Sequence, residues 1–205
     1  MKAHNQKFLA SCLATLVILL PILVWGSSLP RPLSQVSLYE LFPVFGLLAF
    51  SIFWLQLLGL LCKPYLTHLS LRPFFKWSSH AFMTFVIAHP LLLAIAQFNN
   101  HLGLPLQSFY DYVPSNLTGY INLAVIAFLV FVITEITGWI GNTPWIQKFA
   151  KPLEYVNYLT FFLVFWHSIH LGQHLQSGWL LTVWWFFVIT GLPIITTLII
   201  RDIKK

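Results

Sequence analysis

Long apolar stretches separated by short polar connections dominate the pattern of this chain. Six of the stretches are long enough to be membrane helices, because one crossing needs about 20 predominantly apolar residues. They are expected at residues 8–25, 41–62, 77–98, 120–139, 155–174 and 179–200. The pattern therefore predicts an all-α fold, a six-helix transmembrane bundle in which residues 1–205 form a single domain.

The composition agrees with this prediction. Hydrophobic residues make up 58% of the chain and charged residues only 8%, whereas a soluble domain typically has about 25% charged residues. The connections between the predicted helices are too short to form a separate soluble domain. We therefore expect a multi-pass integral membrane protein whose outer surface contacts membrane lipid.

The cations are distributed very unevenly between the two ends of the predicted bundle. Ten of the eleven Lys and Arg residues fall at the end that carries both termini, and only Arg31 falls at the other. Because positively charged connections stay on the inner side, both termini are predicted to be cytoplasmic, in a bacterial cytoplasmic membrane. These flanks explain the net charge of +6, which therefore does not indicate nucleic-acid binding.

The predicted span at residues 155–174 carries three histidines, His167, His170 and His174. At about 100° per residue, their spacings of three and four place all three on one stripe of a helix. Polar side chains inside hydrocarbon are costly unless something there binds them. The stripe therefore predicts a functional site in this half of the bundle.

His89 has the same predicted depth as His167. Each lies twelve residues after the aromatic residue that begins its span, Trp77 or Tyr155, and the two spans run in the same direction. For a single histidine, a hydrogen bond to a neighbouring helix is the simpler interpretation. Two imidazoles at matched depth instead fit the two axial positions of a haem iron, whose other four positions a porphyrin fills. The pair favours one haem b held by His89 and His167.

This arrangement resembles the ferric reductase-like transmembrane domain family, which includes the NADPH oxidases, the ferric reductases and the MsrQ-like membrane cytochromes b. The similarity is carried by Gly46 to Ala49, by Ser79 ten residues before His89, and by the segment from Leu153 to His167. The resemblance implies a helical bundle that transfers electrons through haem to the non-cytoplasmic side. It also implies that His89 and His167 are the ligands of the outer haem.

The chain departs from the family pattern at the second haem, which lies nearer the cytoplasm in many members. The ligands of that haem would fall at Phe75 and Glu154, and neither side chain is a plausible ligand. His80 does not replace them, because it lies nine residues from His89 and therefore on the opposite face of the helix. We therefore expect a single haem in the outer half of the membrane.

His80 and Glu135 are candidates for a further polar site. Each lies about one turn inside the cytoplasmic end of its span, so the two side chains could meet at equal depth. One interpretation is a structural hydrogen bond between neighbouring helices. The other is a proton-carrying site that binds the head group of a quinone.

His170, His174 and His101 lie towards the opposite end of the predicted bundle. Their spacing is compatible with zinc or copper ligation by imidazole. It is equally compatible with solvated side chains that contact the haem propionates, and the sequence favours this second interpretation because no cysteine or nearby carboxylate joins them.

Electron transfer is the predicted function, from quinol or a partner subunit to an acceptor beyond the outer face. The sequence has no glycine-rich phosphate loop, so we expect no flavin or nicotinamide site in this chain. The chain would then be the electron-transfer subunit of an oxidoreductase. One alternative is a haem-less structural or assembly subunit of the same family. The other is a histidine-lined metal transporter, against which the sequence shows no repeated halves and no pair of broken helices.

Overall fold

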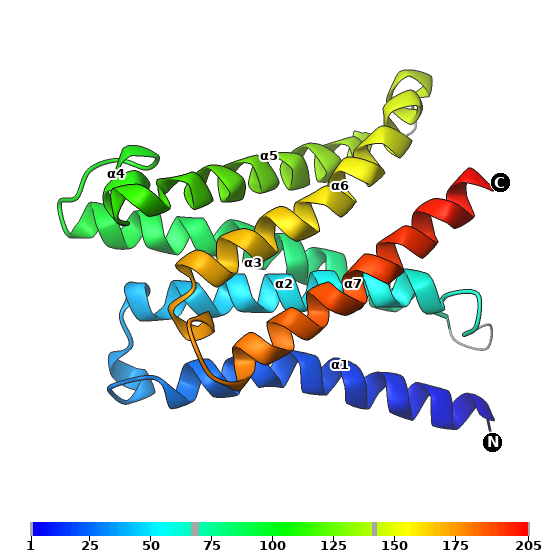
Figure 1. The fold of residues 1–205 in the computed structure, drawn as a ribbon, viewed down its shortest axis with the longest axis horizontal. Helices are drawn as coiled ribbons and strands as arrows, with labels where there is room; N and C mark the ends of the chain where they lie inside the picture. Colours follow the sequence, from blue (N-terminus) through cyan, green and yellow to red (C-terminus); the bar gives the residue numbers. More distant parts are fainter. Residues whose placement is uncertain (1, 67–69, 141–142, 205) are drawn as a thin grey trace.

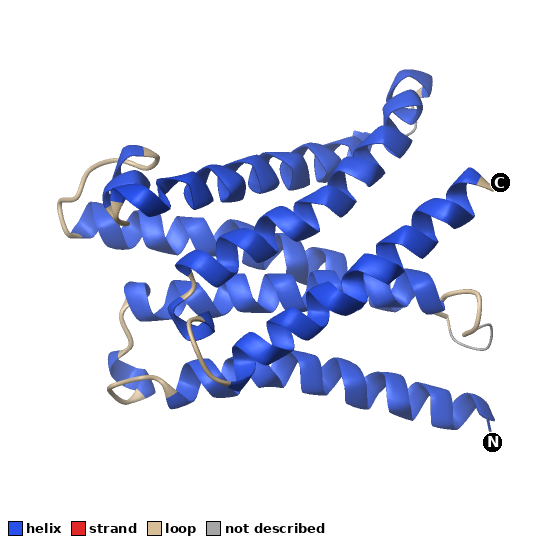
Figure 2. Ribbon diagram, in the orientation of Figure 1, coloured by secondary structure: helices blue, strands red, loops and turns tan. Residues whose placement is uncertain are grey.

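The computed structural model describes residues 2–66, 70–140 and 143–204, and these residues form helices joined by short loops, with no strand among them. Figure 2 shows this all-α architecture, which the sequence predicted. The long helices of Figure 1 are α1 (Lys2–Ser27), α2 (Leu38–Cys62), α3 (Arg72–Asn99), α5 (Thr118–Ile140), α6 (Pro144–Leu171) and α7 (Trp179–Ile203). Shorter elements are α4 (Gln107–Asp111), η1 (Leu33–Gln35), η2 (Ser115–Leu117) and η3 (Gln173–Leu175).

Five helical segments of the described chain are long and apolar enough to cross a membrane, so the chain is an integral membrane protein. The exception among the long helices is α6, which is less apolar because it carries polar residues such as Glu154, Asn157 and His167. The five segments are Phe8–Ser27, Leu38–Cys62, Arg72–Asn99, Ser115–Thr137 and Trp179–Ile203.

Successive long helices alternate in direction, so both ends of the chain lie at the same end of the bundle (Figure 1). Helix α2 packs closely on α3, and α5 on α6, as two hairpins, while α1 and α7 pack on α2. The helix ends that carry Lys63, Arg72 and Arg201 lie at the end with the termini. The side chains of Lys2, Lys7 and Lys205 lie outside the described part of the structure.

Helix α6 differs most from its predicted span of residues 155–174. It begins at Pro144, because proline is well suited to the first turn of a helix. It ends at Leu171, and the prediction that it continues to His174 was wrong. The reason is Gly172, whose backbone leaves the helical conformation at φ −76° and ψ 105°. A β-carbon there would lie 2.5 Å from the carbonyl oxygen of Ser168, so this turn requires glycine.

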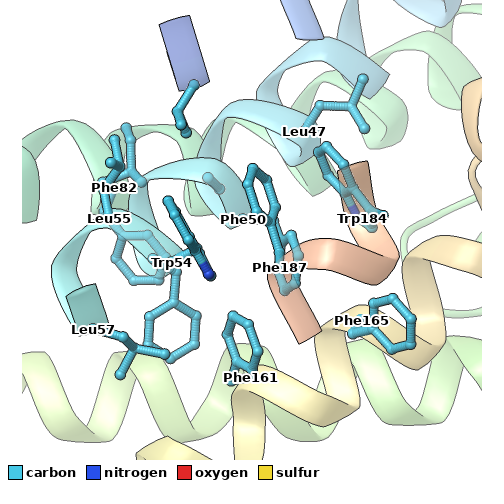
Figure 3. Close-up of a cluster of buried hydrophobic side chains, with 14 of the residues drawn as sticks. Leu47, Phe50, Trp54, Leu55, Leu57, Phe82, Phe161, Phe165, Trp184 and Phe187 are labelled. Carbon is cyan, nitrogen blue, oxygen red and sulfur yellow. The ribbon is translucent and has the colours of Figure 1, made fainter. Parts of the chain in front are cut away.

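Aromatic side chains from α2, α6 and α7 form the centre of the bundle (Figure 3). Phe50 of α2 stacks on Phe161 of α6 with ring centroids 4.9 Å apart, and Trp54 stacks on Phe187 of α7 at 4.6 Å. The indole of Trp184 is fully buried, and its Nε1–H donates a hydrogen bond to the hydroxyl of Ser168. Stacking of this kind fixes α6 and α7 against α2, and α6 is the helix that carries His167.

Candidate functional site

His89 lies on α3, and its ring is oriented by the neighbouring helix α2. The ring Nδ1 is 2.8 Å from the carbonyl oxygen of Phe42. Because a carbonyl only accepts hydrogen bonds, Nδ1 carries the hydrogen and Nε2 keeps its lone pair. The ring lies directly against Gly46, where a β-carbon would come within 2.9 Å of the ring Cε1 and Nδ1 atoms. Gly46 therefore provides the space that the His89 ring occupies.

His167 is held in the same way on the other hairpin. It lies on α6, and its Nδ1 donates a hydrogen bond of 2.9 Å to the carbonyl oxygen of Tyr120 on α5. This contact again leaves Nε2 as the nitrogen with a free lone pair. The two histidines therefore share one tautomer, which is the tautomer that a metal ligand bonding through Nε2 requires.

The two imidazole rings lie close together, as the matched depths predicted. The ring centroids of His89 and His167 are 6.5 Å apart, and the ring planes are inclined at 87°. With metal–nitrogen bonds of about 2.0 Å and centroids about 1.2 Å behind the bonding nitrogens, two imidazoles on opposite sides of one iron have centroids about 6.4 Å apart. Two imidazoles at this separation would be able to hold one haem between them, which would supply one-electron transfer.

Aromatic residues enclose the outer side of His89. The ring of Phe42 lies 5.3 Å from that of His89 between centroids, and Tyr112 contacts Phe42 edge-on and stacks on Tyr39. Burial, and then the neighbouring Tyr39, raise the pKa of the Tyr112 phenol, so this group stays neutral. The hydroxyl of Tyr39 is buried and has no hydrogen-bond partner within the described residues. It is a donor that an anionic group of a bound cofactor could use.

The predicted stripe of three histidines is not formed, because His174 lies beyond the end of α6. His170 remains on the helix, where its ring stacks on that of Tyr120 with centroids 3.8 Å apart and its Nδ1 donates to the carbonyl of Trp166. His174 lies in η3, and its Nδ1 is 3.3 Å from the hydroxyl of Ser28 at the end of α1. Partial burial lowers the pKa of His174.

The predicted zinc or copper alternative receives no support from these positions. His101 lies in the exposed loop after α3, with a positive φ of 59°. Among the residues that the structure describes, no three His, Cys, Asp or Glu side chains come together as possible metal ligands. The geometry therefore brings together His89 and His167, and leaves His101, His170 and His174 in separate surroundings.

His80 and Glu135 do not form the predicted contact. His80 is exposed on α3 and lies near the ring of Trp77, with ring centroids 6.5 Å apart. Glu135 is partly buried on α5, and no hydrogen bond or ion pair joins it to His80 in the described structure. Equal depth does not place two side chains on facing sides of their helices, and this rotation decides whether they meet.

The sequence did not reveal the partners that orient His89 and His167. These partners are the backbone carbonyls of Phe42 and Tyr120, and a backbone carbonyl has no sequence signature. Gly46 was noted only as part of a family-like segment, although a glycine inside an apolar helix often marks a close approach of another group. That signal could have identified the face of α2 that receives His89.

Comparisons of the chain with protein family models, with curated proteins and with solved structures find no match. The functional interpretation therefore rests on the residues themselves. Its basis is the paired geometry of His89 and His167 and the packing of the helices that carry them.

Proposed function

We propose that this chain is a membrane b-type cytochrome with one bis-histidine haem, held by His89 and His167. It passes electrons from quinol or a partner subunit to an acceptor on the non-cytoplasmic side of a bacterial cytoplasmic membrane. The observation that carries this proposal is the pair of imidazoles at 6.5 Å, each oriented by a carbonyl of its own hairpin. When bound, the haem supplies one-electron transfer.

The carbonyls of Phe42 and Tyr120 have a chemical role in this function. Each accepts the Nδ1–H of its histidine and so keeps the Nε2 lone pair directed away from the hairpin. A hydrogen bond at Nδ1 also increases the basicity of the ligating nitrogen and fixes the plane of the ring. The backbone of α2 and α5 therefore sets ligand orientation before any cofactor binds.

Aromatic side chains pack on the cytoplasmic side of the histidine pair. Phe82 lies seven residues before His89 and Phe161 six before His167, which is about 10 Å along each helix. Both rings contact Phe53, with centroids 5.5 Å from it in each case. These aromatic side chains lie between the level of the histidine pair and the level of Phe75 and Glu154, where the ligands of a second haem would fall in the family that the chain resembles.

The two positions of the missing inner ligands have other contacts. Phe75 packs near Gly59 of α2, and a β-carbon on Gly59 would lie 3.1 Å from the Phe75 ring. The carboxylate of Glu154 accepts a hydrogen bond of 2.6 Å from the hydroxyl of Tyr158. Neither side chain supplies a nitrogen ligand, which agrees with one haem in the outer half of the bundle.

The proposal includes α6 as the sixth membrane span, with both termini in the cytoplasm. Helix α6 packs against α2, α5 and α7. Its polar side chains near the cytoplasmic end have partners, because Tyr155 donates a 2.8 Å hydrogen bond to Asp202 of α7. The excess of cations at the end with the termini supports the orientation.

A single haem cannot carry an electron across a hydrocarbon layer about 30 Å thick. Electrons must therefore reach the site within the bilayer, from quinol or from a partner subunit. In this proposal the chain is the electron-transfer subunit of an oxidoreductase, and the reaction with the final substrate takes place on another protein.

The ratio of haem to protein in purified variants tests the proposal. We expect one haem b per chain in the wild type, and loss of haem in His89→Ala and in His167→Ala. His80→Ala and His101→Ala are the matched controls, because neither residue lies at the proposed site, and both should keep the haem. Retention of a full complement of haem in either ligand variant would contradict the assignment.

A further inference from the structure

The two hydrogen bonds that orient the histidines join residues at the same separation in sequence. His89 bonds to the carbonyl 47 residues before it, and so does His167. Phe42 and Tyr120 are consequently 78 positions apart, as are the two histidines. The hairpin of α2 and α3 and the hairpin of α5 and α6 also run in the same sense through the bundle (Figure 1). One hairpin thus corresponds to the other at an offset of 78 residues.

The same offset pairs identical residues in the middle of the hairpins. Phe53 and Phe131 are the best example, because their rings are in edge-on contact at 5.3 Å. When equivalent residues of two copies touch each other, they lie near a two-fold axis, as in an isologous dimer. His89 and His167 form a second contact of this kind. The identical pairs are Ala49 and Ala127, Phe50 and Phe128, Phe53 and Phe131, Val86 and Val164, His89 and His167, and Leu93 and Leu171.

We infer that the two hairpins form a local two-fold repeat, and that Gly46 and Ala124 are its equivalent positioning residues. Each stands four positions after the carbonyl that accepts the histidine Nδ1–H. In a helix, the residue four positions on lies directly over that carbonyl. A small side chain there lets an imidazole approach a carbonyl that already accepts a backbone hydrogen bond within the helix.

This repeat corrects the expectation that the chain has no repeated halves. Outside the paired positions the two hairpins differ in sequence, so the pattern is not visible without the hydrogen bonds. The repeat does not favour a transporter, because α2, α3, α5 and α6 are continuous helices, whereas transporter sites are typically formed by interrupted ones.

The test measures the two histidine rings separately, in haem-free protein labelled with ¹⁵N-histidine. We expect both rings to show hydrogen-bonded Nδ1–H in NMR spectra. Gly46→Ala should abolish this signal for His89 alone, and Ala124→Leu should abolish it for His167 alone. Gly59→Ala is the matched control. Gly59 lies on α2, as Gly46 does, but its β-carbon would crowd the rings of Phe74 and Phe75 on α3, away from the histidines.

The role of these residues towards the cofactor rests on the proposed function, and a second measurement isolates it. In haem-loaded protein, Gly46→Ala should change the low-spin EPR signature, whereas Gly59→Ala should leave it unchanged. Unaltered His89 signals in Gly46→Ala would overturn the inference, with or without haem. If the purified wild-type protein contained no haem but still showed the NMR pattern, the proposed cytochrome function would be contradicted and the inferred two-fold repeat would stand.

An independent observation concerns a cavity of about 670 Å³ where α2 and α3 leave the predicted membrane region. Three cations line it, Lys63, Arg72 and Lys76, and no carboxylate does. None of the three makes an ion pair within the described residues, whereas Lys151 at the same end pairs with Asp202 at 3.1 Å. Among the described residues, no carboxylate therefore neutralises the positive charge of the cavity. Apolar side chains complete the lining, from Leu66, Leu71 and Phe75.

We also propose that this cavity binds the head group of an anionic phospholipid. Lysine and arginine at a membrane surface attract phosphate oxygens, and basic pockets between transmembrane helices on the cytoplasmic side suit such head groups. The adjacent apolar side chains would contact the glycerol and the first part of the acyl chains. The combination of cations with apolar lining favours a lipid over a free anion.

Native mass spectrometry of protein from nanodiscs of phosphatidylcholine with phosphatidylglycerol tests this proposal. We expect retained phosphatidylglycerol in the wild type, and about 30-fold weaker retention in Lys63→Gln/Lys76→Gln, at roughly 1 kcal/mol per cation. Lys148→Gln/Lys204→Gln removes the same charge at the same end, outside the cavity, and should retain the lipid. Equal losses in the two double variants would overturn the proposal. So would displacement of the lipid by millimolar inorganic phosphate, which would assign the cavity to a free anion.

Discussion

His89 and His167 face each other from two different hairpins, with their ring centroids 6.5 Å apart and their planes nearly perpendicular. Each ring is held by a carbonyl on the other helix of its own hairpin. The close packing of α2 on α3 and of α5 on α6 therefore orients the rings, and the contact between hairpins sets their separation. The relative placement of the two imidazole rings therefore follows from helix packing.

Phe161 should be a major source of stability, because it is fully buried between Phe50 and Phe53. Phe161→Ala leaves a cavity in the centre of the bundle and should cost about 3–5 kcal/mol of unfolding free energy. Phe8 is 68% exposed on α1, and Phe8→Ala is therefore the control that should cost little. Thermal unfolding in detergent measures both. Similar midpoints for the two variants would show that the aromatic centre does not hold the bundle together.

Substitution of two glycines by alanine should have different effects on the stability of the protein. Gly172→Ala places a β-carbon 2.5 Å from the Ser168 carbonyl, so it should disturb the end of α6 and destabilise the protein by about 1–3 kcal/mol. A β-carbon on Gly26 of α1 would meet nothing within 4 Å. Gly26→Ala should therefore leave stability unchanged or raise it by up to about 1 kcal/mol. Chemical denaturation of the two variants checks the sign, and a neutral Gly172→Ala would refute the account of how α6 ends.

His174 should make the stability of the outer end depend on pH. Burial lowers its pKa in the folded protein below the ordinary value of 6.5, so the unfolded chain binds a proton at higher pH than the folded chain does. Its contribution to stability is therefore complete above pH 6.5 and is lost as the pH falls from 6.5 through the lower folded-state pKa. Thermal unfolding at pH 7.5 and pH 5 should show a larger loss in wild type than in His174→Gln. An equal loss in the two proteins would exclude this role.

The all-α fold and five of its membrane-spanning helices could be predicted from the sequence, because the length of an apolar stretch that crosses a membrane is set by the membrane thickness. The meeting of His89 and His167 could also be anticipated, since matched depth on two helices running in the same direction is visible in the spacing. For His80 and Glu135, equal depth along the helices was not enough to predict a contact between the side chains. Whether two side chains meet also depends on how each helix is rotated about its axis.

The end of α6 was missed because the spacing of His167, His170 and His174 was taken as one helical stripe, whereas the backbone leaves the helical conformation at Gly172. The hydrogen bonds from the histidines were missed because their acceptors are the backbone carbonyls of Phe42 and Tyr120. The two-fold relation of the hairpins was missed for the same reason, since it is defined mainly by these bonds. Features that depend on backbone geometry are therefore the ones that the pattern of side chains could not predict.

The most direct test of the central claim is the reduced-minus-oxidised absorption spectrum of the purified wild-type protein from haem-sufficient cells. Two imidazoles on one iron give a low-spin b-type centre, so we predict a sharp α-band in the difference spectrum. The band should correspond to one haem per chain and be absent from His89→Ala and His167→Ala. A folded, colourless wild-type protein would contradict the claim and favour a haem-less structural subunit instead.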